Sequence, residues 1–64
     1  MEMQASEVKA IAARLLAGLL ANPHIYSQIS DDAAKGQQEQ FLTVLSIDMA
    51  EGLIRKVQER SSSS

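Results

Sequence analysis

A helical stretch with two apolar sides, residues 40–60, constrains this chain more than any other feature. One set of large apolar residues recurs there at three- and four-residue spacings and forms a first seam: Phe41, Leu42, Leu45, Met49 and Leu53. A second seam on the same stretch comprises Ile47, Ala50, Ile54 and Val57. At about 100° per residue, the two seams together cover more than half of the helix circumference. Such a helix needs packing partners on two sides.

A first helix is predicted upstream, over residues 6–21, because alanine, leucine, lysine and arginine dominate that segment. Ser6 is its expected N-cap. Its large apolar side chains span about 180° of the helix, well beyond the stripe of a usual surface helix. The remaining side is lined with small residues, among them Ala13 and Ala17, and Arg14 rises from that surface. This small-residue side would allow another helix to approach closely.

Pro23 ends the first helix, because proline cannot continue it and restricts the residue before it. The connection over residues 24–30 is expected to be a loop that contains at most a short extra helical turn. Residues 30–32, Ser-Asp-Asp, predict a new N-cap, from which a helix can continue to residue 60. Gly36 is the weak point of this second helix, so a kink or a separate short helix there is the alternative.

The predicted fold is all-α, an antiparallel hairpin of two helices. The domain is expected to cover residues 6–60, between a frayed N-terminus at 1–5 and a disordered serine tail at 61–64. A chain of 64 residues buries only about 60 % of its unfolded surface, and without cysteine it forms no disulfide. Oligomerisation is the remaining common source of stability.

One hairpin cannot cover two seams on one helix and a half-circumference on the other. The natural completion is a homodimer in the form of a four-helix bundle, with a higher cyclic oligomer as the alternative. The expected interface contains the second seam and the small-residue side of the first helix. Its residues are Ile47, Ala50, Ile54, Val57, Ala13 and Ala17.

Composition disfavours several classes of function. The formal net charge is −2, so the chain lacks the basic surface that binds nucleic acid or anionic lipid. Its longest apolar run is far shorter than the roughly 20 residues of a membrane span, and its acidic start differs from a secretory signal. A cytoplasmic protein is therefore expected. With His24 as the single histidine, no catalytic site, metal site or cofactor is predicted.

Arg14, Tyr26 and Lys35 form the one candidate binding set. The simpler interpretation is that Arg14 only keeps the small-residue side of its helix soluble. The sharper hypothesis is that Arg14 and Lys35, with the Tyr26 ring of a neighbouring subunit, hold an anionic ligand or a carboxylate of a partner.

Two segments of the chain carry a resemblance. Residues 11–23, IAARLLAGLLANP, and residues 48–54, DMAEGLI, resemble small phage- and prophage-encoded helical proteins of unknown function, which share a first helix of the form A-x-x-x-L-x-G-L-L-A-x-P. The likeness extends over most of residues 10–57 and includes no catalytic residue. It implies a viral accessory protein that acts stoichiometrically.

The leading hypothesis is therefore a small, non-enzymatic, homo-oligomeric helical protein that binds or inhibits a host protein. One alternative is an oligomeric sponge that sequesters a nucleotide-like anion at subunit interfaces. A small nucleic-acid-binding regulator is a further alternative, weakened by the acidic balance of the chain.

Overall fold

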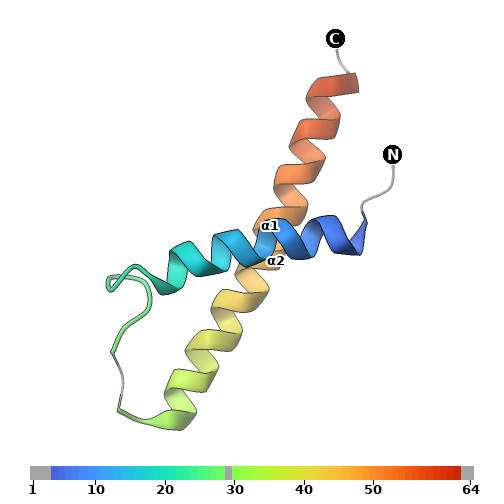
Figure 1. Ribbon diagram of the computed structural model, residues 1–64. Helices are drawn as coiled ribbons and strands as arrows, with labels where there is room; N and C mark the ends of the chain where they lie inside the picture. Colours follow the sequence, from blue (N-terminus) through green and yellow to red (C-terminus); the bar gives the residue numbers. More distant parts are fainter. Residues whose placement is uncertain (1–3, 29, 63–64) are drawn as a thin grey trace.

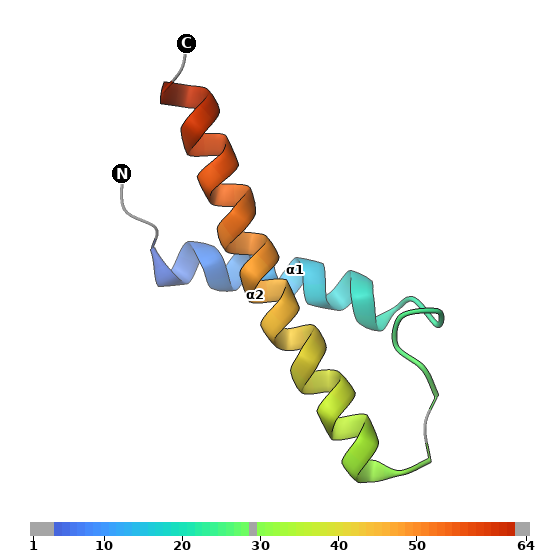
Figure 2. The ribbon, with the colours of Figure 1, turned by 180° about the vertical axis from the view of Figure 1, so that it is seen from behind.

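The computed structural model describes residues 4–28 and 30–62, and these residues form two helices, α1 (Ala5–Leu20) and α2 (Asp32–Ser62). The helices pack against each other as a hairpin (Figure 1), which confirms the predicted all-α fold. They cross near their middles instead of lying along each other, as the view from behind also shows (Figure 2). The molecule is consequently open and elongated, with extents of 50 × 20 × 13 Å.

The N-terminal end of helix α1 lies two residues earlier than predicted. The carbonyl of Gln4 accepts hydrogen bonds from the amides of Glu7 and Val8, both at 3.1 Å, so Gln4 is the N-cap. The prediction that Ser6 caps the helix is wrong, because Ala5 and Ser6 already lie within the first turn. No side chain caps this end. Of the N-terminal residues expected to be frayed, 1–3 lie outside the described part of the chain.

Helix α1 ends at Leu20, close to the predicted position before Pro23. The connection then contains one hydrogen-bonded turn, because the amides of Ile25 and Tyr26 both donate to the carbonyl of Asn22, at 3.0 and 2.8 Å. The side chain of Asn22 also accepts from the amide of His24, at 2.9 Å. The expected short turn in the connection is thus present.

Helix α2 begins where the sequence predicted. Asp31 is the N-cap, since its Oδ1 accepts from the amide of Ala33 at 2.9 Å and lies 3.5 Å from that of Ala34. The helix is continuous through Gly36, so the alternative of a separate short helix that ends there is wrong.

The C-terminal end of α2 differs from the prediction. The helix continues to Ser62, whose hydroxyl donates to the carbonyl of Gln58 at 2.9 Å. The predicted disordered tail is therefore helical at residues 61–62. Residues 63–64 lie outside the described part of the chain.

One row of α2 side chains, spaced four residues apart, packs against α1. We call it the inner row: Gln38, Leu42, Ser46, Ala50, Ile54 and Gln58. Its four central members are buried and the two outer ones are half-buried. Rows at this spacing run obliquely to the helix axis, and helices that pack through them cross at about 50°. The inner row therefore accounts for the open crossing seen in Figures 1 and 2.

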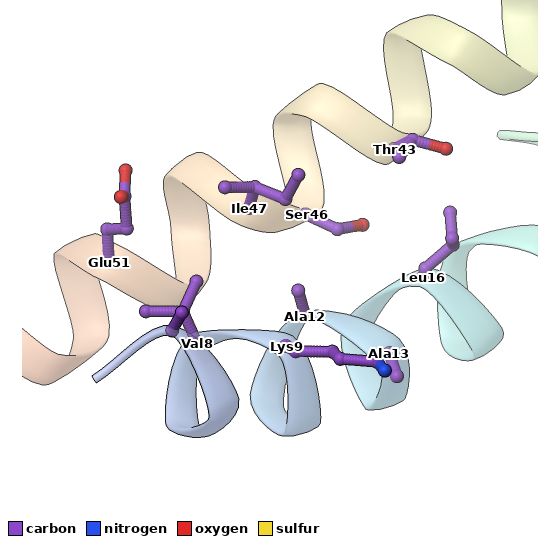
Figure 3. A pocket seen from close by; sticks show the side chains of 10 residues that line it. Val8, Lys9, Ala12, Ala13, Leu16, Thr43, Ser46, Ile47 and Glu51 are labelled. Carbon is purple, nitrogen blue, oxygen red and sulfur yellow. The ribbon is translucent and has the colours of Figure 1, made fainter. Parts of the chain in front are cut away.

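Small residues occupy the crossing point. Ala12 of α1 is 7 % exposed, and Ser46 and Ala50 of α2 are 1 % and 0 % exposed. Ala12 points from α1 toward Ser46 (Figure 3). The hydroxyl of Ser46 donates to the carbonyl of Leu42 in its own helix, at 2.8 Å, so its burial leaves no polar group unsatisfied. Small side chains at this point let the two backbones approach closely.

Candidate functional site

A second row of α2 side chains lies directly beside the inner row and is left largely uncovered by α1. We call it the outer row: Phe41, Leu45, Met49, Leu53 and Val57. Phe41, Leu53 and Val57 are 65 %, 50 % and 56 % exposed. Such a continuous line of large apolar side chains is typical of a protein interaction surface.

Residues of α1 widen the apolar surface of the outer row. Leu15 lines a shallow hollow of about 350 Å³ together with Met49, Gly52 and Leu53. Ile11 lines a second hollow, of about 440 Å³, into which Leu53 and Val57 also face. The apolar surface therefore follows the outer row and continues onto the adjoining side of α1.

The predicted division of α2 into two seams is wrong in one respect. Ala50 and Ile54, assigned to the oligomer interface, are buried against α1 within the single chain. Val57 and Ile47 of the same seam are exposed. The reason is that the contact with α1 follows a four-residue row, which crosses obliquely from one predicted seam to the other.

A groove opens on the other side of the inner row, where α1 and α2 diverge (Figure 3). This crossing groove has a volume of about 430 Å³. It is lined by Ala5, Val8, Lys9, Ala12, Ala13, Leu16, Thr43, Ser46, Ile47 and Glu51. Its walls are mainly apolar, with Lys9 and Glu51 supplying opposite charges. The predicted interface residues Ala13 and Ile47 both line this groove, whereas Ala17 is exposed elsewhere on α1.

The predicted binding set is brought together only in part. The ammonium group of Lys35 lies 5.9 Å from the centre of the Tyr26 ring, within the range of a cation–π contact. Both residues belong to the same chain here, whereas the hypothesis drew Tyr26 from a neighbouring subunit. Arg14 is exposed on α1 and makes no hydrogen bond or ion pair with the other described residues.

Sequence reasoning missed two polar residues of this cluster. The hydroxyl of Tyr26 donates to Oε2 of Glu39 at 2.7 Å. The side-chain amide of Gln38 accepts from the amide of Ser27 at 3.1 Å and donates to its carbonyl at 3.2 Å. Together these contacts fasten the connection to the first turns of α2. No spacing in the sequence signals them, because the partners are 11 or 13 residues apart on different elements.

The pKa of the Tyr26 hydroxyl is raised above its ordinary value of 10.0, first by the hydrogen bond to Glu39, then by desolvation, and last by repulsion from the Glu39 carboxylate. We expect the absorbance titration of this single tyrosine to have its midpoint above pH 10, and Glu39→Gln to lower it toward 10. Because the folded pKa is raised, the contact stabilises the fold fully below pH 10 and is lost as pH rises through the folded pKa. Glu7→Gln, on α1, is the control and should leave the midpoint unchanged; an unchanged midpoint in Glu39→Gln would contradict the contact.

In residues 4–28 and 30–62, no three histidine, cysteine or acidic side chains lie close enough to hold a metal ion. No helix in the same ranges has the length and apolar character needed to cross a membrane.

No protein-family model, curated protein or solved structure matches this chain. The outer row and the crossing groove are therefore the features from which a function can be argued.

Proposed function

We propose that this chain is a non-enzymatic helical interaction protein that works as a homo-oligomer, most simply a dimer. The observation that carries the proposal is how little apolar surface the single chain covers. Among the described residues, four apolar side chains are buried: Ala12, Leu42, Ala50 and Ile54. Two of the four are alanines, while eight large apolar side chains are more than a third exposed.

The dimensions of the chain support the same proposal. Its accessible surface is 5074 Å², whereas a compact protein of this size exposes about 4,000 Å². Its radius of gyration is 14.4 Å, against about 11 Å for a compact domain of this length. Conformational entropy opposes folding throughout the chain, and a core of four small or medium side chains offsets little of it. Association with a second copy would bury the missing apolar area.

The two apolar surfaces could serve two partners. One copy of the chain needs one of them for self-association, which leaves the other for a different protein. The crossing groove is wide enough for one or two apolar side chains of a partner helix. Lys9 and Glu51 line the same groove and could pair with polar side chains at the edge of the partner's surface. In keeping with the resemblance to phage and prophage proteins, we propose a protein of the host cell as that partner.

The sponge hypothesis has one supporting observation, the contact of Lys35 with the Tyr26 ring. The neighbouring Glu39 carboxylate weighs against it, because an incoming anion would be repelled and the Tyr26 hydroxyl already has an acceptor. A nucleic-acid-binding role has no comparable support, since the net charge is −2.

Native mass spectrometry of protein purified without denaturation tests the proposal, with sedimentation at tens of micromolar as a check on mass in solution. We expect a dimer, or a larger closed oligomer, that carries no small molecule. A monomer in both measurements would overturn the proposal. An assembly with a stoichiometric adduct of nucleotide mass would replace it with the sponge.

A further inference from the structure

We infer that two copies of this chain pair through their outer rows, with the two α2 helices antiparallel and the two Met49 side chains meeting at the two-fold axis. This inference rests on the proposed homo-oligomer and specifies its contact surface. It also replaces the interface expected from the sequence, two residues of which are buried inside the single chain.

The outer row is complementary to itself under such a two-fold rotation. Its five members are evenly spaced, so Met49 is the midpoint of the row. Because the row runs obliquely, the two helices cross at about 50°, and an antiparallel copy places Leu45 against the partner's Leu53 on each side of the axis. Phe41 and Val57 flank this central contact, so apolar residues meet apolar residues within it, as an isologous interface requires. The residue at the axis is the flexible Met49, which adapts to a symmetric contact with its own copy.

The charges of α2 favour the antiparallel direction. With Met49 at the axis, residues 36–48 lie beside the partner's residues 50–62. Residues 36–48 carry two carboxylates and no basic side chain, whereas residues 50–62 carry three basic and two acidic side chains. A parallel pair would place the two copies of residues 36–48 together, where like charges repel.

The excess accessible surface of the chain is similar to the area that each partner buries in a stable dimer. The chain exposes about 1,000 Å² more than a compact protein of its size, and a stable interface of standard size buries about 800 Å² on each partner. The outer row, with Leu15 and Ile11 beside it, is the part of the exposed apolar surface that a second copy would cover.

The position of Gly52 also favours pairing through the outer row. It lies beside the outer row in the middle of α2, where glycine disfavours a helix by about 1 kcal/mol relative to alanine. Nothing within the chain needs glycine there, since an added Cβ would meet no atom within 4 Å. A missing side chain at this point opens a channel next to the outer row, into which the row of a second copy can fit.

This arrangement leaves the crossing groove free. The inner row lies between the outer row and the groove, so a copy bound to the outer row does not cover Ile47 or Thr43. The dimer would then present two crossing grooves to other partners.

Disulfide trapping tests the inference, because the chain contains no cysteine of its own. Under mild oxidation, Met49→Cys should form a covalent dimer at least ten times faster than Ile47→Cys, the matched variant in the crossing groove. Leu45→Cys and Leu53→Cys should each link slowly alone and rapidly when mixed. In the antiparallel pair, the two copies of a residue four positions from Met49 lie about 12 Å apart along the helix direction. This separation is beyond the reach of a disulfide.

The outcomes separate this inference from the proposed function. Each reduced variant is first sedimented, to show that it has the mass of the unmodified protein. If the protein is a dimer but Ile47→Cys links fastest, the crossing groove is the interface and the inference is wrong. If Leu45→Cys links to itself as fast as to Leu53→Cys, the helices run parallel and the inference is again wrong. A monomeric unmodified protein would instead contradict the proposed function.

Discussion

Replacing Ile54 with aspartate is expected to unfold most of the protein. Ile54 is 5 % exposed and belongs to the inner row that holds α2 against α1. Burying an unpaired charge costs about 3–5 kcal/mol, which equals or exceeds the stability that a core of this size supplies. Circular dichroism at 222 nm during thermal unfolding would show a lost or strongly lowered transition.

Ile47→Asp is the matched control for this experiment. The same substitution is made on the same helix, seven residues earlier, at a side chain that is 40 % exposed. The new carboxylate reaches water there, so the melting temperature should fall by no more than a few degrees. Equal loss of stability in both variants would show that the assignment of the inner row is wrong.

Replacing Leu53 with aspartate is expected to dissociate the proposed dimer. Leu53 is 50 % exposed in the single chain, so the substitution leaves the contact between α1 and α2 in place. In the proposed pair it lies against the partner's Leu45, and the two-fold rotation repeats the change on the other side of the axis. A lost central apolar contact costs about 2 kcal/mol or more, so two of them weaken association by about 1,000-fold. Sedimentation equilibrium over a range of concentrations measures this shift.

Val44→Asp is the control for dissociation, because Val44 is 51 % exposed on the same helix and lies outside the outer row. We expect this variant to keep the dimer mass. Dissociation by Val44→Asp with an intact Leu53→Asp dimer would show that copies associate through a different side of α2.

Local chemistry explains what could be predicted. The end of α1 before Pro23 and the N-cap at Asp31 follow from single residues whose effect reaches only their own turn. The two seams of α2 follow from periodicity, which reports that both sides of the helix are apolar. Local chemistry also misled at Ser6 and at the serine tail, where helix continues despite a weaker local preference.

The candidate binding residues could be predicted only in part, because their contacts join different elements of the fold. Arg14, Tyr26 and Lys35 were grouped by chemical type, and the structure joins only Tyr26 and Lys35. Glu39 is the stronger partner of Tyr26, yet no periodic pattern connects a loop residue with a helix residue 13 positions away. The sequence could not distinguish between the candidate functions for the same reason, because that distinction depends on which apolar residues stay exposed in the folded chain.

Periodicity thus establishes two amphipathic helices and an excess of apolar surface, because each depends on residues within a few turns of one another. The division of that surface into a buried inner row, an exposed outer row and a crossing groove came only from the tertiary structure. Small residues at Ala12, Ser46 and Ala50 let the helices approach along an oblique row, and the angle of that row decides which side chains are covered. A helical wheel contains no crossing angle, so it could not separate Ile54, which is buried, from Leu53, which is half exposed.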